Sequence, residues 1–405
     1  MKIIHISTGE QKIPAEMGGG IEGYILMLAK SMAQLGHSVT IIDRKYSMGD
    51  PNISYIDKVR IMRLDCYRFS SFSFYPRLAI NQIIYAIKIN HHLANVDYDI
   101  LHVHSSIVGL FLSIINLEMR KRLYYTTHAT RRTNEFGSSA GVIGSVSLLL
   151  ENQLVRRARN TITLNDLVRE NLLLTTGVQR TTIITLPVVI DTEKFRPGLD
   201  IGCIKKKFDL DGKFVSLFVG RIRVDKGIEY LVRAADIVVN KFCYRNTLFL
   251  LVGPTEEFGA GKGAQSPYQS KIIQLIKDFR LERNVNLTGP LSTDDLIKLY
   301  TACDIFILPS LTEAMPTAIL EAMACSKAVI GTRVGGIPMQ IRDNQNGLLI
   351  DPAAEMQLAE AIRYMIDNPE DRIMMGLCGR KMAEDEFSSD RIAYQLVEIY
   401  KNTAV

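Results

Sequence analysis

The 405-residue sequence predicts an α/β protein built from two doubly wound, parallel-sheet domains. The length exceeds what one hydrophobic core usually serves. Short apolar runs alternate with helical stretches along the chain, as expected for strands buried on both faces of a parallel sheet. The polar, proline-bearing segment 191–200 separates two such series. We therefore expect domains at 1–190 and 201–385, a linker at 191–200, and a final helix over 386–405 that packs back on the first domain.

Each half contains its own series of apolar strand candidates. In the first half, strands are expected at 2–7, 38–43, 100–105, 123–128, 160–164 and 182–187. In the second half, they are expected at 214–220, 248–253, 284–289, 304–310, 327–332 and 346–351. Amphipathic patterns predict helices at 21–35, 78–94, 145–157 and 389–402. Ligands of doubly wound sheets bind at the carboxyl ends of strands, so the loops that follow these runs are the candidate sites.

Composition narrows the class of protein. Hydrophobic residues make up 47% of the chain and charged residues 22%, which is typical of a globular protein. The six cysteines include no C-x-x-C pair, which favours reduced cytosolic thiols and argues against a disulfide framework or a zinc site. The start, "MKIIHIST", enters a strand directly, and the most apolar stretch, 107–117, is too short to span a bilayer. We expect an intracellular, cytoplasmic protein.

Positive charge is concentrated in the first half of the chain. Residues 1–190 hold 21 lysines and arginines against 14 acidic residues, whereas the remainder holds 27 against 29. This asymmetry indicates that the first domain meets an anionic partner, although a solvated basic face explains any single cluster equally well. Nucleic acid is disfavoured because the chain contains no recognisable nucleic-acid-binding module.

A glycine-rich loop, "GGGIEG" at 18–23, precedes the first helix. It fits G-x-G-x-x-G, and Asp43 lies twenty residues beyond Gly23, as in a dinucleotide fingerprint. However, about ten residues separate the preceding strand from Gly18, whereas the fingerprint needs its first glycine directly after the strand. A glycine loop that opens a helix still suits an anion, because free backbone N–H groups face it. We expect phosphate contact here ahead of a purely structural loop, and dinucleotide binding well behind both.

The segment "FVGRIRVDKGIEYLVRAAD" at 218–236 places Arg221 after a strand and Lys226 before a helix. A lysine at a helix N-terminus is opposed by the helix dipole, by roughly 0.3–1 kcal/mol. An anion held between these two cations would reverse that effect, and the arginine fork with the mobile lysine charge suits a diphosphate. For Lys226 alone, the alternative is a surface ion pair with Asp225 or Glu229.

Two glutamates lie eight residues apart in "PSLTEAMPTAILEAMAC". Glu313 is expected in a loop, and Glu321 on a helix that begins with Pro316 as its first residue. Because a bound diphosphate repels carboxylates, these side chains are expected to bind neutral sugar and ribose hydroxyls. The alternative for Glu321 is an exposed helix charge. Its neighbours in "AILEAMA" are apolar or small, and a buried carboxylate needs a partner.

Together these motifs resemble the retaining glycosyltransferases of family four, also called glycosyl transferases group 1. The similarity covers nearly the whole chain, through segments 18–42, 219–227, 309–325 and 334–352 in the family's order. It implies the GT-B fold, in which two Rossmann-like domains face each other across a cleft, with the acceptor on the first and the nucleotide-sugar donor on the second. The implied reaction moves a sugar from a nucleoside-diphosphate sugar to a glycan, lipid-linked or small-molecule acceptor, in polysaccharide or glycolipid biosynthesis.

The resemblance also implies roles for individual residues. Arg221 and Lys226 would bind the donor's diphosphate, Glu321 its ribose, and Glu313 the transferred sugar. His128, which closes a predicted strand, matches a family histidine near that sugar, although a strand-end histidine is more often structural. The implied catalytic residues are Glu313, His128, Arg221 and Lys226. The implied donor site comprises Gly19, Gly20, Arg221, Lys226, Glu313, Ala314, Met315, Pro316, Thr317 and Glu321.

The same resemblance implies a hexosyltransferase-like enzyme without a metal or cofactor, because no D-x-D motif lies near these residues. The cations would instead offset the charge that builds on the departing diphosphate. Two alternatives stay open: a nucleotide-sugar epimerase of the same architecture, and a non-catalytic nucleotide-sugar-binding protein. The basic first domain also suits peripheral binding to an anionic membrane, through the helix at 78–94 and segment 69–77.

Overall fold

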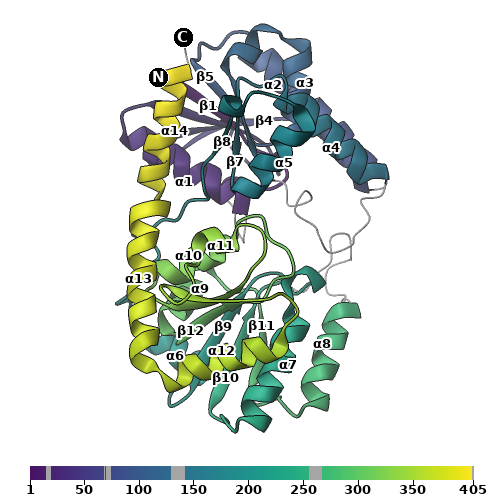
Figure 1. The fold of residues 1–405 in the computed structure, drawn as a ribbon. Coiled ribbons are helices and arrows are strands. Elements are labelled where there is room, and N and C mark those ends of the chain that lie inside the picture. The colour runs from purple at the N-terminus through teal and green to yellow at the C-terminus, as the bar shows by residue number, and fades with distance from the viewer. Residues whose placement is uncertain (15–19, 68, 70–73, 129–141, 255–266, 404–405) are drawn as a thin grey trace. The chain divides into compact units, whose positions relative to one another are not determined.

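A computed structural model describes residues 1–14, 20–67, 69, 74–128, 142–254 and 267–403 of the chain. The chain folds into two compact units (Figure 1). Unit 1 comprises Met1–Val189 together with Ser389–Val405, and unit 2 comprises Ile190–Ser388. The segment 191–200 belongs to unit 2, where the Arg380 guanidinium donates to the carbonyl oxygens of Thr192 and Phe195 at 2.9 and 2.8 Å.

Unit 1 is built on an eight-stranded sheet with the order β3-β4-β2-β1-β5-β6-β7-β8. Its strands are β1 (Lys2–Ile6), β2 (Ser38–Arg44), β3 (Ile53–Ile56), β4 (Val59–Leu64), β5 (Ile100–Val103), β6 (Leu123–Thr127), β7 (Asn160–Thr163) and β8 (Ile183–Thr185). All neighbours are parallel except β3, which runs antiparallel to β4. The parallel sheet that we predicted thus carries one antiparallel edge strand that we did not predict, where a tight turn with Asp57 at φ +52° returns the chain.

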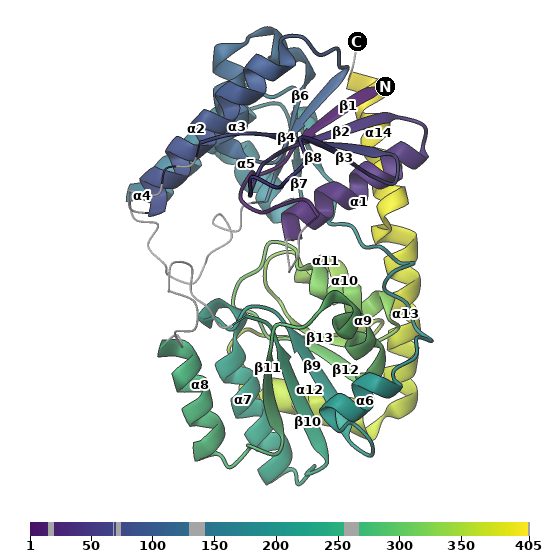
Figure 2. The ribbon, with the colours of Figure 1, turned by 180° about the vertical axis from the view of Figure 1, so that it is seen from behind.

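Helices cover both faces of this sheet (Figure 2). They are α1 (Gly20–Gln34), α2 (Phe74–Leu93), α3 (Ser106–Ile115), α4 (Val142–Val155), α5 (Asp166–Thr176) and α14 (Ser389–Thr403). Helices α1 and α14 pack against each other on one face, and α2 to α5 cover the other. Among the described helices, none combines the length and apolar character that a bilayer crossing requires.

Alternating residues of the central strands face these two layers. Ile4 and Val103 belong to the apolar core shared with α2 to α5. His5 and His102 lie one position away along the same strands and are fully buried on the opposite face. There His102 Nδ1 is hydrogen-bonded to the Tyr400 hydroxyl of α14. The face under α1 and α14 is thus unusually polar for a sheet interior.

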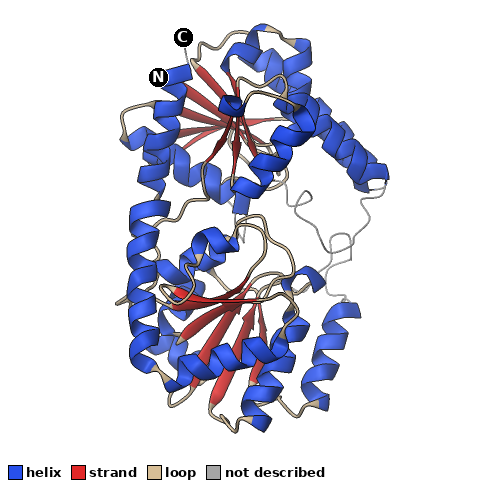
Figure 3. Cartoon of the chain, in the orientation of Figure 1, coloured by secondary structure: helices blue, strands red, loops and turns tan. Residues whose placement is uncertain are grey.

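Unit 2 is built on a six-stranded, fully parallel sheet with the order β11-β10-β9-β12-β13-β14. Figure 3 shows the strands of both units in red and the helices around them in blue. Its strands are β9 (Phe214–Val219), β10 (Thr247–Val252), β11 (Val285–Gly289), β12 (Ile305–Leu308), β13 (Ala328–Thr332) and β14 (Gly347–Ile350). Its helices are α6 (Gly202–Phe208), α7 (Ile228–Asp236), which a π-helical turn at Ile237–Lys241 extends, α8 (Pro267–Asp278), α9 (Thr293–Ala302), α10 (Thr317–Ala324), α11 (Ile337–Gln340), α12 (Glu355–Asp367) and α13 (Pro369–Phe387).

The strand order of unit 2 identifies where a ligand is expected to bind. Numbered along the chain, its strands follow the order 3-2-1-4-5-6 of doubly wound nucleotide-binding folds. The order reverses between β9 and β12, and the crevice outside their carboxyl ends is the usual ligand site. The loops after these two strands carry the cationic and carboxylate residues that sequence analysis identified.

Candidate functional site

The loop after β9 lies against the end of β12 in unit 2. Gly227, at φ +65°, follows a 3-10 turn at Val224–Lys226 and precedes α7. A Cβ atom at Gly227 would lie 1.9 Å from the carbonyl oxygen of Pro309, so only glycine permits this approach. The N–H of Leu311 donates to the carbonyl of Asp225 at 2.8 Å. The backbones of the two loops at the switch point are therefore in direct contact and hydrogen-bonded to each other.

This packing brings Lys226 and Glu313 into direct contact. Lys226 Nζ lies 2.5 Å from Glu313 Oε1, and their side chains are only 16% and 8% exposed. The Ser310 hydroxyl donates to the same carboxylate oxygen at 2.8 Å. The surface ion pair that we considered for Lys226, with Asp225 or Glu229, is not formed, because those carboxylates pair with other basic side chains.

The loop that carries Glu313 is supported from behind by the β13–α11 segment. A Cβ at Gly335 would lie 1.7 Å from the Glu313 carbonyl oxygen, and Gly336 N–H donates to the Ala314 carbonyl at 2.8 Å. The Gln340 amide donates to the Pro316 carbonyl at 2.9 Å. The motif at 334–352, for which the sequence predicted no structural role, thus positions the loop that carries Glu313.

Helix α10 begins one residue later than predicted. Pro316 has ψ +128°, outside the helical range, so it is the capping residue and Thr317 is the first helical one. Met315 is buried just before this cap. The amide N–H groups of Met315 and Thr317 therefore lie at the start of the helix, where Pro316 has none to offer.

Glu321 lies on α10 and has its own partner. The Tyr300 hydroxyl of α9 donates to Glu321 Oε2 at 2.7 Å. Burial raises the pKa of Glu321, while the hydrogen bond from Tyr300, the charge of Lys194 and the Thr317 hydroxyl oppose that rise. Within the described chain Glu321 is bonded to neither Lys226 nor Glu313. It therefore offers a second, separate carboxylate rather than a solvated helix charge. Arg221 is exposed in the loop after β9.

Of the glycine-rich segment 18–23, the structure describes Gly20 onward, where α1 begins. Gly20 is exposed at the start of α1, and Gly19 lies outside the described residues. Asp43 is fully buried and accepts hydrogen bonds from the Ser7 hydroxyl at 2.7 Å and the Ile13 N–H at 3.0 Å. The acidic residue of a dinucleotide fingerprint is therefore occupied by the protein itself, which agrees with setting that interpretation aside.

His128 lies directly after β6 and belongs to a larger group of histidines. Its Nε2 is 3.1 Å from Nδ1 of His104, and burial lowers the pKa of His128 to about 3. His5 and His102 lie in the same group. None of His5, His102 and His104 was predicted from the sequence to be a site residue. The signal was present in "LHVHS", because two histidines at positions i and i+2 of a strand point to the same face.

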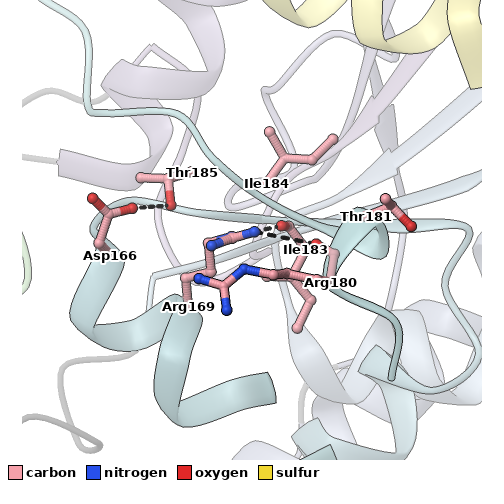
Figure 4. Close-up of a pocket in the computed structure, with 7 residues that line it drawn as sticks. All are labelled: Asp166, Arg169, Arg180, Thr181, Ile183, Ile184 and Thr185. Atoms are coloured by element: carbon pink, nitrogen blue, oxygen red, sulfur yellow. Dashed lines mark hydrogen bonds between the residues drawn. The ribbon is translucent and has the colours of Figure 1, made fainter. Parts of the chain in front are cut away.

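The pocket in Figure 4 lies beside β8 in unit 1, and none of the site residues described above lines it. It has a volume of about 460 Å³. The guanidinium of Arg169 donates to the Ile183 carbonyl at 2.9 Å, and Arg180 pairs with Glu170 at 2.6 Å. The arginines are therefore engaged within the protein, and we assign the pocket no function. Its lining comprises Asp166, Arg169, Arg180, Thr181, Ile183, Ile184 and Thr185.

The fold and the switch-point residues are those of a two-domain enzyme that binds a nucleotide. Comparison with known proteins identifies its family. The family model "Glycosyltransferase Family 4" matches residues 18–194, and the model "Glycosyl transferases group 1" matches residues 202–382. The chain belongs to the family-four glycosyltransferases.

Individual relatives agree with this assignment. D-inositol 3-phosphate glycosyltransferase of Corynebacterium urealyticum is 25% identical over 410 residues, covering 98% of this chain and 94% of that protein. Sucrose-phosphate synthase from Thermosynechococcus elongatus matches with a TM-score of 0.84 and 22% identity, over 99% of this chain and 98% of that one. HepE of Anabaena, solved with UDP-glucose, matches with a TM-score of 0.75 and 20% identity, over 99% of this chain and 100% of that one.

These matches confirm three predictions from the sequence. The fold is GT-B, the protein is an enzyme, and its reaction is glycosyl transfer from a nucleotide sugar. The epimerase and the non-catalytic binding protein are not favoured.

Proposed function

We propose that the chain is a retaining glycosyltransferase that binds a nucleoside-diphosphate sugar at the switch point of unit 2. The observation that carries this proposal is the Lys226–Glu313 pair, in which a cation and a carboxylate come from the loops of β9 and β12. A doubly wound sheet binds its ligand at this position. Lys226 can thereby bind the diphosphate of the donor, and the neighbouring Glu313 can accept hydrogen bonds from its hydroxyls.

Donor binding requires Lys226 to exchange partners. A diphosphate carries more charge than one carboxylate, so the ammonium of Lys226 moves to the phosphate oxygens together with the exposed Arg221. Glu313 is repelled by the same phosphates and is released to accept hydrogen bonds from the transferred sugar. The Ser310 hydroxyl keeps Glu313 in the loop during this exchange.

The start of α10 and Glu321 bind the remaining parts of the donor. The backbone N–H groups of Met315 and Thr317 face the diphosphate at the positive end of the helix. Glu321 accepts hydrogen bonds from two neighbouring ribose hydroxyls while Tyr300 fixes its carboxylate. The ribose contact of Glu321 is the same in substrate and transition state, so it serves donor binding. The N–H groups at the helix start also face the charge that builds on the leaving diphosphate.

Catalysis depends on charge that develops on the leaving diphosphate. Lys226 and Arg221 stabilise that charge, and removal of one such group typically lowers kcat by roughly 10² to 10³. The departing phosphate takes the acceptor's proton on the same face of the sugar, which gives retention. Because these side chains supply the positive charge, we expect transfer to be unchanged by EDTA. A loss of activity restored by Mg²⁺ or Mn²⁺ would contradict metal independence.

The acceptor is proposed to meet the basic unit 1 from the cytoplasmic face of a membrane. The excess of basic residues in 1–190 suits an anionic lipid surface or a phosphorylated acceptor, and the relatives named for D-inositol 3-phosphate accord with the latter. Ile87 and Lys88 are exposed on α2, and Leu149 is exposed on α4. Co-sedimentation should retain the protein on anionic vesicles and release it in high salt. Equal retention on neutral vesicles would contradict this part of the proposal.

A ligand screen tests the donor proposal directly. Thermal unfolding is measured with UDP-, GDP- and ADP-sugars, each beside its nucleoside monophosphate, and any stabilising sugar nucleotide is then assayed for hydrolysis and transfer. We expect one base to stabilise the chain, and its diphosphate to do so more than its monophosphate, because the switch point holds the cations. If none of these donors stabilises the protein or is consumed, the proposed donor site is wrong.

A further inference from the structure

Three histidines of unit 1 form a hydrogen-bonded chain beneath α1 and α14. His5 Nδ1 lies 3.1 Å from His104 Nε2, and His104 Nδ1 lies 3.1 Å from His128 Nε2. They belong to the neighbouring strands β1, β5 and β6, at or just beyond the strand ends. The ring centroids are 5.5 and 5.4 Å apart, so the bonded nitrogens lie close to the line between ring centres. These are hydrogen bonds in the planes of the rings.

All three imidazoles are neutral at physiological pH. Burial lowers the pKa of His5 to about 4 and of His128 to about 3, and brings that of His104 well below 6.5. A neutral imidazole has one N–H and one lone pair. His104 is bonded at both nitrogens, so it donates at one and accepts at the other. The chain therefore has only two complete arrangements, with the proton on Nδ1 of every ring or on Nε2 of every ring.

The buried end of the chain distinguishes the two arrangements. Among the described residues, Nε2 of His5 has no hydrogen-bond partner and is shielded from solvent. If the protons lie on Nδ1, that nitrogen presents only an unpaired lone pair. If they lie on Nε2, it presents a buried N–H without an acceptor, which is the rarer and costlier defect in folded proteins. The first arrangement is therefore the stable one.

We propose that His104 and His5 are positioning residues that hold His128 with its proton on Nδ1, so that His128 donates a hydrogen bond to a sugar oxygen. This inference rests on the proposed function and on the place near the transferred sugar that the family resemblance gives to His128. In this tautomer Nδ1 has no lone pair, and Nε2 is bonded to His104. His128 therefore selects a donor sugar by its oxygen acceptor and does not act as a general base.

A metal site is the competing interpretation of the same cluster. The ligand atoms of His5, His102 and His104 lie within 4.8 Å of one another. However, both nitrogens of His104 are used in the chain, and those of His102 are bonded to the hydroxyls of Tyr400 and Thr126. A metal would have to displace these partners, because a bound imidazole needs a lone pair directed at the ion. The cluster is therefore a hydrogen-bond chain.

The first test is the tautomer itself, read without substrate. Long-range ¹H–¹⁵N spectra of the whole protein, labelled at its histidine ring nitrogens, report which nitrogen of each ring carries the proton. We expect the proton on Nδ1 of His5, His104 and His128. A proton on Nε2 of His128 would overturn the proposal. This measurement needs no catalytic activity, so it decides the chain's arrangement even if the proposed donor site fails.

A matched pair of substitutions tests the consequence for transfer. Aspartate in His5→Asp accepts a hydrogen bond from Nε2 of His104, whereas asparagine in His5→Asn has the same shape and can still donate. We expect His5→Asp to move the His128 proton to Nε2 and to lower kcat/KM by up to about tenfold, the effect of one hydrogen bond. His5→Asn should keep the Nδ1 tautomer and the higher rate. Reversal of the tautomer without a change in transfer would overturn the positioning role.

Nucleotide binding separates this proposal from the proposed donor site. Both His5 variants should bind a nucleoside diphosphate as the unsubstituted protein does, because the cations of the donor site lie in unit 2. Loss of nucleotide binding in both variants alike would mean that the substitutions disturb the whole fold, and the wild-type tautomer would then decide the proposal alone.

Discussion

Units 1 and 2 share one architecture but place different chemistry at their switch points. In unit 2 the loops of β9 and β12 meet through the charged Lys226–Glu313 pair. In unit 1 the corresponding strands, β1 and β5, meet through the neutral rings of His5 and His104. A charged pair can exchange partners with an ionic ligand, whereas neutral rings can only donate and accept hydrogen bonds. The topology sets the position of a site, and the residue types set the ligand.

The ion pair of unit 2 and the histidines of unit 1 also differ in how the free-energy cost of burying a charge is avoided. In unit 2 each charge is offset by its partner, and a hydroxyl completes the carboxylate's hydrogen bonds. In unit 1 burial removes the charge itself, by lowering each imidazole's pKa below physiological pH. The sequence accentuates the contrast, because all seven histidines of the chain lie in unit 1 and unit 2 contains none.

The largest effect should follow removal of the cation of unit 2. Lys226→Ala is expected to lower kcat for transfer by roughly 10² to 10³, because the leaving diphosphate loses its stabilising charge. Steady-state kinetics with the identified donor would measure it. The matched control is Lys213→Ala, which removes a lysine paired with Asp209 just before β9, at the opposite end of that strand. Equal rates for the two variants would remove Lys226 from the mechanism.

Acid should distinguish the two units next. The pKa of His5 is about 4 when folded and 6.5 when unfolded, so between these values the unfolded chain binds more protons. The contribution of His5 to the free energy of unfolding is therefore fully present above pH 6.5. It falls as the pH drops, by about 1.4 kcal/mol per pH unit for each such histidine. Urea unfolding followed by circular dichroism at pH 7.5, 6 and 5 should show unit 1 weakening first.

The two His5 substitutions described above sharpen this test. His5→Asn should make the pH dependence shallower, since one titrating ring is removed from the cluster. If unit 2 weakens over the same range as steeply as unit 1, buried histidines are not the cause of the acid sensitivity.

A smaller effect, of opposite sign for binding and catalysis, is expected at Glu313. Glu313→Gln keeps a hydrogen-bond acceptor for Ser310 but no longer competes as a charge for Lys226. We expect a free nucleoside diphosphate to bind up to about fivefold more tightly, the effect of a modest ion pair. Sugar transfer should fall. Isothermal titration with UDP, or the diphosphate of the preferred base, beside a transfer assay measures both. Weaker diphosphate binding would show that Glu313 supports the phosphates rather than competing with them.

The smallest expected effect concerns the separate carboxylate of unit 2. Tyr300→Phe removes the hydrogen bond to Glu321, which is worth about 0.5–1.5 kcal/mol. If Glu321 binds ribose equally in substrate and transition state, the donor KM should rise by up to about tenfold with kcat little changed. Tyr244→Phe, which removes an exposed hydroxyl bonded to Asp367, is the control. A fall in kcat instead would assign Glu321 to the chemical step.

Local patterns in the sequence were sufficient for most elements of the fold. Each predicted strand is present, because a run of buried apolar residues has few other ways to satisfy its backbone. Strand β4 was missed because Arg60 and Arg63 interrupt its apolar pattern, and β3 was missed because its run ISYI is only four residues long. The start of α10 was misplaced by one residue because proline suits both the last residue before a helix and the first within it.

Contacts between distant segments were beyond what the sequence could predict. Lys226 and Glu313 were both proposed as site residues, but their direct contact depends on Gly227 packing on Pro309. His5 and His104 are joined only by the parallel pairing of β1 with β5. Spacing along the chain carries no information on such partners, because strand order decides which loops become neighbours.

The membership of α14 in unit 1 has a consequence for how the chain is made. Residues 1–189 leave the ribosome before unit 2, and the helix that packs on α1 and bonds His102 through Tyr400 leaves after unit 2. All of Ile190–Ser388 is translated in between, which takes roughly 10 to 40 s at about 5–20 residues per second. During that interval unit 1 lacks helix α14. In each round of synthesis, unit 2 is therefore complete before unit 1.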